Sequence, residues 1–197
     1  RHLHLPVQSG STRVLERMRR RYTRESYLDL IAQARETIPD VAVSTDMIVG
    51  FPGETAEDFD QTLSLTAAVR YHSMFSFKYS PRPNTFAQKR LADDVSDADK
   101  TARIVALQTL QRDIQTALHE ALVDTTVTVL VDAVGRRAGD DMSGRTHGNT
   151  LVNCPRPAGA GDPAGWLGRT VNVRVRRAGP HSVWGEMVSP VPQGAAL

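Results

Sequence analysis

Three strand-like runs of residues alternate with two amphipathic segments in the first half of the chain, and this alternation constrains the fold most. The runs cover residues 2–7, 41–49 and 74–79, and apolar residues at helical spacing separate them. A strand–helix–strand–helix–strand order with short connections predicts a parallel sheet covered by helices. Three strands are too few to close a barrel of eight, so we expect an incomplete α/β barrel.

Polar residues predict where the helices begin. Thr23 is a good N-cap for a helix that carries Tyr27 and Ile31 on its buried face. Thr55 and Asp58 resemble a capping box at the start of the next helix. The inner face of that helix is expected to contain Phe59, Leu63, Thr66, Ala67 and Val69. A third, long helix is expected from residue 96 to about 123.

The pattern changes to short alternating strands after residue 123. Val127, Val129 and Val131 alternate with polar residues, as do the valines between 171 and 175. A chain segment this short forms a small closed β-barrel most economically. We therefore predict an α/β partial barrel over residues 1–123, a small all-β barrel over 124–190 and a tail over 191–197, with a loop at 155–165.

Cysteine content restricts the chemistry of the chain. A single cysteine among 197 residues cannot form an intramolecular disulfide, which suits a reducing, cytoplasmic setting. It also cannot hold an iron–sulfur cluster, and Cys154 reads as a small buried apolar residue. No apolar stretch is long enough for a membrane helix. The first residues read like the middle of a strand, so we expect the chain to be part of something longer.

The carboxyl ends of the three predicted strands are unusually polar. They carry Gln8 and Ser9, the segment 50–54, and the segment 79–82. In parallel barrels, functional groups gather at these ends. Gly50 and Gly53 would let the backbone approach a ligand closely, whereas Glu54 could be a simple helix-start carboxylate favoured by the helix dipole; both interpretations remain open. A third, weaker hypothesis pairs Glu54 with Asp46 as an acid and a base.

Arginines cluster in the second part of the chain. Five of them could contact successive phosphates of a nucleic-acid backbone: Arg145, Arg169, Arg174, Arg176 and Arg177. The alternative is a solvated polar face on a small barrel. The pattern favours RNA binding through shape and backbone contacts.

Four motifs, in order, resemble those of the radical S-adenosylmethionine (SAM) methylthiotransferases. They lie at residues 5–11, 19–24, 48–55 and 75–83. Residues 126–188 look like that family's C-terminal TRAM domain. The resemblance covers nearly the whole chain and implies a partial radical SAM barrel followed by a TRAM barrel.

The resemblance also implies cofactors and site residues. By position, it assigns a share of the SAM pocket to Gln8, Ser9, Gly50, Phe51, Pro52, Gly53, Glu54, Tyr79 and Ser80. Arg82 would join the five arginines named above in binding RNA. Two [4Fe–4S] clusters would belong to the full-length parent, because their cysteine ligands are absent here. The chain is therefore expected to hold no catalytic or metal-ligating residue of its own, and to be inactive without the missing N-terminal half.

The implied reaction adds a methylthio group to C2 of isopentenyladenosine next to the anticodon, with the anticodon stem-loop of tRNA as partner. The alternatives are a sister enzyme acting on threonylcarbamoyladenosine, a relative acting on a ribosomal protein, and a non-catalytic RNA-binding module. The sequence departs from the family pattern at Asn84 and Phe86. Asn84 can adopt a left-handed turn, so we expect its loop to survive, whereas Phe86 bears on substrate fit.

Overall fold

The computed structural model describes residues 1–135, 141–156 and 163–190, with backbone only for residues 189 and 190. The chain divides into two compact units, one formed by Leu3–Ile114 and the other by Gln115–Leu197 with Arg1–His2. This division falls inside helix α5, Asp97–Glu120. The predicted tail lies outside the described residues, and the predicted boundary at residue 123 stays a prediction.

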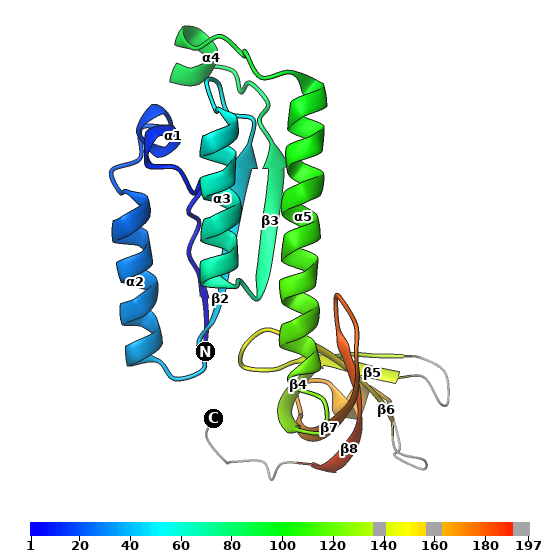
Figure 1. Cartoon of the computed structure of the whole chain (residues 1–197). Coiled ribbons are helices and arrows are strands. Elements are labelled where there is room, and N and C mark those ends of the chain that lie inside the picture. The colour runs from blue at the N-terminus through cyan, green and yellow to red at the C-terminus, as the bar shows by residue number, and fades with distance from the viewer. Residues whose placement is uncertain (136–140, 157–162, 191–197) are drawn as a thin grey trace. The chain divides into compact units, whose positions relative to one another are not determined.

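The first unit is built on a three-stranded sheet with the order β1–β2–β3 (Figure 1). The strands are β1, His2–His4; β2, Ala42–Val49; and β3, Ser73–Lys78. β2 and β3 run parallel, and Gln8 extends the parallel pairing through an isolated bridge to Met47. The predicted parallel sheet of an unclosed α/β barrel is thus confirmed.

β1 ends three residues earlier than predicted, and Pro6 gives the physical reason. Proline has no N–H to donate to a neighbouring strand. A side chain replaces the missing ladder contact: the Thr45 hydroxyl donates to the Leu5 carbonyl (2.9 Å) and accepts from the Val7 N–H (3.0 Å). The chain therefore stays beside β2 as far as Gln8 without being a regular strand.

Helices cover one side of this sheet (Figure 1). They are α1, Thr12–Arg17; α2, Arg24–Thr37; α3, Ala56–Val69; and the start of α5. The short α4, Phe86–Arg90, lies beyond the ends of the strands and buries no residue (Figure 1). Both predicted helix starts are confirmed. Thr23 caps α2 and closes a capping box with Ser26, and Thr55 does the same with Asp58 at α3.

The core of the first unit lies between the sheet and these helices. Side chains of α2, α3 and α5 pack with the strands around Tyr71, Leu65 and Leu107, which are fully buried. The predicted inner face of α3 was partly wrong: Ala67 is exposed, and Leu65 with Thr62 takes its place. On the other face of β3, Phe75 and Phe77 stay 59% and 53% exposed.

The second unit contains a closed five-stranded barrel, as the sequence predicted, with the order β4–β5–β6–β8–β7. Its elements are β4, Thr126–Val134; β5, Asp141–Arg145; β6, Leu151–Pro155; a 3-10 turn, Pro163–Trp166; β7, Thr170–Ala178; and β8, Val183–Pro190. The alternating valines of β4 and β7 point into its core. Part of the predicted 155–165 loop, residues 157–162, lies outside the described residues. Across the described ranges, no helix combines the length and apolar character needed to cross a membrane.

Cys154 lies in this barrel core, where only 2% of its surface is exposed, which confirms its predicted role as a buried apolar residue. Burial raises the pKa of its thiol to about 11. Because the thiolate is the reactive form, the folded chain at pH 8 should react with a thiol-specific disulfide reagent roughly 100-fold more slowly than the unfolded chain. Absorbance of the released reagent, with and without guanidinium, measures this ratio. Equal rates would contradict the burial.

Candidate functional site

The segment after β1 and the carboxyl ends of β2 and β3 meet at an open cleft of about 610 Å³ in the first unit. That size suits a nucleoside or another small organic ligand. The lining consists of Gln8, Arg17, Met18, Arg19, Arg20, Asp46, Ile48, Phe51, Phe77, Lys78, Tyr79, Ser80, Arg82, Thr85, Phe86 and Ala87. One part of this lining is aromatic and aliphatic, and another is rich in guanidinium groups.

Gln8 reaches the cleft from a backbone conformation that non-glycine residues seldom adopt. Its φ angle is 72°, in the left-handed region. Two hydrogen bonds fix this geometry: the Gln8 N–H donates to the Asp46 carbonyl (2.9 Å), and the Gln8 carbonyl accepts from the Ile48 N–H (2.8 Å). Such strain persists where surrounding structure over-determines it, often at binding sites.

An aromatic pair forms the apolar wall of the cleft. The rings of Phe51 and Tyr79 meet edge to face, with centroids 5.1 Å apart and planes at 74°. The Tyr79 N–H donates to the Val49 carbonyl (2.8 Å), which anchors this ring at the end of β2. Together with Ile48, the two rings give a planar base an apolar surface at its edge or face.

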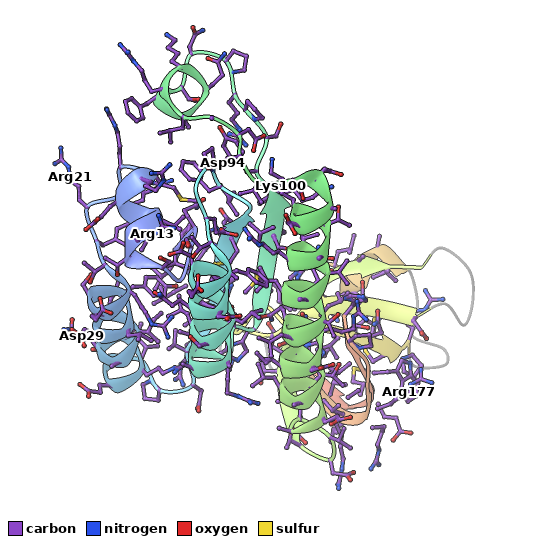
Figure 2. All side chains as sticks on the ribbon, turned by 45° about the horizontal axis from the view of Figure 1, so that its top comes forward. Arg13, Arg21, Asp29, Asp94, Lys100 and Arg177 are labelled. Atoms are coloured by element: carbon purple, nitrogen blue, oxygen red, sulfur yellow. The ribbon has the colours of Figure 1, made fainter. Side chains whose placement is uncertain are left out.

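The loop between β2 and α3 is held from behind by Glu54. Its Oε1 accepts from the Gly50 N–H (2.9 Å) and from the Arg103 guanidinium (2.8 Å). Burial raises the pKa of this carboxyl, and both of those donors oppose the rise. Gly50 has a φ of 70°, and a Cβ there would lie 2.3 Å from the Lys100 side chain. Figure 2 shows Lys100 at the end of the unit where α5 begins.

Asp58 joins the loops that follow β1 and β2. Its carboxylate accepts from the Ser11 hydroxyl (2.6 Å) and the Thr55 N–H (2.8 Å), and the Arg13 guanidinium pairs with both carboxylate oxygens. Burial acts to raise the pKa of Asp58, but these donors outweigh it and hold the pKa well below its usual range. Nearby, a Cβ on Gly10 would lie 2.5 Å from the backbone of α3. The two loops therefore have little freedom to separate.

His4 and Asp46 form a second polar group on the open face of the sheet. His4 Nε2 lies 3.5 Å from Asp46 Oδ1, and His4 Nδ1 lies 2.9 Å from the Ser44 hydroxyl. Asp46 lines the cleft, whereas Glu54 is committed to Gly50 and Arg103. The arrangement therefore gives the hypothesis of a Glu54–Asp46 acid–base pair no support.

The arginines of the second unit lie on the outer surface of its barrel. Arg174 and Arg176 alternate with buried valines on β7, and both approach Asp124, at 3.7 Å and 3.3 Å. Arg176 also pairs with Glu186 (3.1 Å).

The other three arginines have neighbours of their own. Arg145 lies 3.5 Å from Asp132. Arg169 and Arg177 each stand 5.6 Å from the ring of a tryptophan, Trp166 and Trp184 respectively. The five residues thus form a basic but partly neutralised surface.

Comparison with known proteins agrees with both units. Residues 1–66 match the family model of the Radical SAM superfamily, and residues 120–188 match that of the TRAM domain. The first unit thus carries part of a radical SAM domain, and the second carries a TRAM domain.

Relatives match the chain along nearly its whole length. The tRNA-2-methylthio-N(6)-dimethylallyladenosine synthase of Geobacter metallireducens is 46% identical over 94% of this chain and 40% of its own length. The proteins of that name from Moorella thermoacetica (46%; 95% and 40%) and Acidithiobacillus ferrooxidans (43%; 100% and 42%) match similarly. These relatives confirm the resemblance predicted from the four motifs. The chain spans about 40% of their length.

Among solved structures, coproporphyrinogen III oxidase from Escherichia coli, described as a radical SAM enzyme, aligns at 19% identity with a TM-score of 0.47. The alignment covers 76% of this chain and 44% of that one. Likeness at this level adds nothing to the assignment, which rests on the sequence relatives and the two domain models.

The structure brings together four of the nine residues predicted for SAM. Gln8, Phe51, Tyr79 and Ser80 line the cleft, and so does Arg82 from the predicted RNA-binding set. The other five do not line it: Ser9, Gly50, Pro52, Gly53 and Glu54. They lie in the supporting loops; for example, the Arg17 guanidinium donates to the Pro52 carbonyl (2.9 Å) and Asp94 accepts from the Gly53 N–H (2.6 Å).

Sequence reasoning missed several lining residues. Ile48 and Phe77 could have been found from strand alternation, because they share a face with Tyr79. Arg19 gave no such signal, since it enters the cleft from a helix end. Asp46 and Phe86 were named from the sequence, but for an acid–base pair and for substrate fit rather than as part of the SAM cleft.

Radical SAM proteins imply SAM and iron–sulfur clusters, and the two groups fit this chain differently. Over the described residues, no cluster of three or more His, Cys, Asp or Glu side chains could hold a metal. The single cysteine is buried in the TRAM domain. Within the described ranges the structure shows no group of residues suited to a cluster. The cleft, by contrast, has the size and the mixed aromatic and polar lining that suit the adenosyl part of SAM.

Replacing Asp58 with Asn should loosen the two loops behind the cleft. Loss of the charged partner of Arg13 is expected to lower the free energy of unfolding at pH 7 by about 2 kcal/mol. Because the folded pKa of Asp58 is depressed, its contribution is full above pH 4 and is lost as the pH falls toward the folded pKa. Urea midpoints between pH 7 and pH 3 should fall less steeply in Asp58→Asn than in the wild type.

Asp29→Asn is the matched control for this measurement, since Asp29 is an exposed carboxylate on α2 (Figure 2). It should leave both the stability and its pH dependence unchanged. Equal effects of the two substitutions would contradict the central role of Asp58.

Proposed function

We propose that this chain is the C-terminal part of a tRNA methylthiotransferase. That enzyme adds a methylthio group to C2 of isopentenyladenosine beside the anticodon. The observation that carries the proposal is the meeting of Gln8, Phe51 and Tyr79, from the segments that follow three strands, at one nucleoside-sized cleft. The curated relatives bear the name of that synthase. In the complete protein, this cleft would be one side of the SAM pocket.

We propose that residues of the cleft bind SAM in two groups. Ile48, Phe51 and Tyr79 offer an apolar surface to the adenine ring. The amide of Gln8 and the hydroxyl of Ser80 offer hydrogen bonds to the ribose or to the methionine part. When bound, SAM would supply the radical that starts the reaction.

The supporting residues act through the shape of the loops. Five predicted residues remain candidates for SAM binding although they do not line the cleft, and we assign them the role of positioning Phe51 and Gln8. They are Ser9, Gly50, Pro52, Gly53 and Glu54. The Gly50 and Gly53 N–H groups are already bonded to Glu54 and Asp94, so they serve the loop first. In this proposal, residues 50–54 all serve SAM binding, but only Phe51 contacts the ligand and the other four hold the loop in place.

The cluster chemistry is assigned to the rest of the complete protein. This chain supplies no thiolate for two [4Fe–4S] clusters, and we derive no step through them. What the chain contributes is binding and orientation: it fixes the nucleoside and excludes water from one wall of the pocket. A cytoplasmic location follows from the proposed substrate, tRNA.

RNA binding is assigned to the TRAM domain and to the cleft mouth. A TRAM domain suggests RNA binding, and we propose the anticodon stem-loop of tRNA as the ligand. Arg145, Arg169, Arg174, Arg176 and Arg177 would contact phosphates on the barrel, and Arg82 would do so at the cleft.

A second candidate function is a non-catalytic RNA-binding module. The match of residues 120–188 to the TRAM domain is the observation in its favour. SAM binding separates the two candidates, because a module that only holds RNA has no use for a nucleoside cleft. Threonylcarbamoyladenosine remains an alternative substrate for the enzyme.

Removing the Gln8 side chain should weaken SAM binding without damaging the fold. Glycine accepts a φ of 72° freely, so Gln8→Gly should be at least as stable as the wild type. Loss of one side-chain hydrogen bond should raise the Kd for SAM about 10-fold, measured by equilibrium dialysis.

Asp40→Gly is the control, because it relieves a similar left-handed φ (58°) away from the cleft. It should bind SAM like the wild type. A folded wild-type chain that binds no SAM would refute the share of the pocket assigned to these residues.

Neutralising the strand arginines should weaken RNA binding and reduce its salt dependence. Arg174→Gln/Arg176→Gln removes two cations from the surface of β7, so the slope of log affinity against log salt should fall by about 2. Fluorescence anisotropy of a labelled anticodon stem-loop at several salt concentrations measures both effects. Arg112→Gln, an exposed arginine of α5, is the control and should change neither. An unchanged slope in the double variant would contradict the proposed contact between the barrel surface and RNA phosphates.

A further inference from the structure

Arg19 and Phe86 stack on each other at the mouth of the cleft. The guanidinium carbon of Arg19 lies 3.5 Å from the centre of the Phe86 ring, and both side chains line the cleft. Arg19 follows α1, and Phe86 is the first residue of α4. The two residues are 67 positions apart, so only the folded unit brings them together.

Arg19 holds a backbone position that usually belongs to glycine. Its φ angle is 58°, and the turn after α1 has the Schellman pattern: the Arg20 N–H donates to the Leu15 carbonyl and the Arg19 N–H to the Glu16 carbonyl, both at 2.9 Å. A side chain in this conformation costs conformational free energy that glycine would avoid. Strain of this kind, together with a side chain that lines a cleft, points to a function for the side chain.

Phe86 is an exposed aromatic ring on a well-defined support. The turn before it has Asn84 in the predicted left-handed conformation (φ 67°), and Thr85 caps α4 by accepting from the Gln88 N–H. The ring is 41% exposed, although Arg19 covers part of it. A large exposed ring beside a guanidinium forms a flat surface on which a nucleobase can stack.

Unpaired positive charge surrounds this stack. Among the described residues, Arg19, Arg20 and Arg82 line the cleft without a salt bridge to any carboxylate, whereas Arg13 and Arg103 are paired with Asp58 and Glu54. SAM carries one carboxylate and no phosphate, so it does not account for three guanidinium groups. A ligand with phosphates does.

We propose that the Arg19–Phe86 stack, with Arg20 and Arg82, binds one nucleotide of single-stranded RNA that flanks the target base. The base stacks on the guanidinium–ring pair, and Arg20 and Arg82 contact its phosphates. This inference rests on the proposed action on tRNA. It extends the RNA contact proposed for Arg82 at the cleft by a stacking position for one base, separate from the TRAM arginines. Arg21 has no part in it, because its side chain points away from the unit into solvent (Figure 2).

The test uses the 197-residue chain and an anticodon stem-loop RNA with 2-aminopurine placed at each loop position in turn. Stacking on the pair should quench the fluorescence at one position when the wild type binds. Arg19→Gly and Phe86→Pro should abolish this quenching and weaken binding about fivefold, whereas Phe86→Tyr should keep both.

The two variants are chosen to preserve the fold. Glycine suits the left-handed turn, so Arg19→Gly should raise the melting temperature slightly. Proline suits the first position of a helix, so Phe86→Pro should keep the start of α4. Arg70→Gly is the matched control: it removes another arginine in a left-handed position (φ 54°), but away from the cleft, and should leave quenching and affinity unchanged.

The outcomes separate this inference from the proposed function. At saturating protein, Arg174→Gln/Arg176→Gln should show full quenching despite its lower affinity. RNA binding with no quenched position, or with equal affinity for Arg19→Gly and wild type, would overturn the stacking site and leave the proposed function standing. A folded wild-type chain that binds no RNA would overturn both.

Discussion

The carboxylate of Asp58 is the contact on which the cleft depends. It lies in the first turn of α3, where the helix dipole favours a negative charge, and it ties the loop after β1 to the loop after β2 through Ser11 and Arg13. Each of these loops contributes a wall of the cleft. Glu54 and Arg103 hold the second loop from the side of α5 in the same way. The buried carboxylates of Asp58 and Glu54 therefore fix the loops that form the cleft, and the side chains that line the cleft stay available to a ligand.

Two cleft side chains stand on strained backbone, while the loop between β2 and α3 uses glycine. Gln8 and Arg19 have left-handed φ angles of 72° and 58°, and in both cases backbone hydrogen bonds stabilise the conformation. At Gly50 the opposite constraint holds, because Lys100 occupies the space that a side chain would need. Other left-handed residues, such as Asp40 and Arg70, lie away from the cleft. Backbone strain therefore supports a binding role at Gln8 and Arg19 because their side chains also line the cleft.

The sequence allowed the fold to be predicted well and the cleft only in part. Periodicity and capping chemistry are local, so the parallel strands, the capping box at Thr55 and the left-handed turn at Asn84 were all predictable. The side-chain direction of Glu54 was not, because it is decided by Arg103, 49 positions away. The Arg19–Phe86 contact was equally hidden. The sequence left undecided which member of a polar strand end lines the cleft, since tertiary contacts decide that.

The arginines of this protein are used in three ways, and the difference bears on how RNA would be bound. Arg13 is paired with a buried carboxylate and serves the fold. On the TRAM barrel, Arg174 and Arg176 share Asp124, so a phosphate that binds them competes with an existing partner and gains less than the full charge–charge interaction. At the cleft, Arg19 and its neighbours have no such competitor among the described residues. If the chain acts on tRNA as proposed, the barrel supplies a broad, salt-sensitive attraction. The more selective contact then lies at the cleft, where the target base must enter.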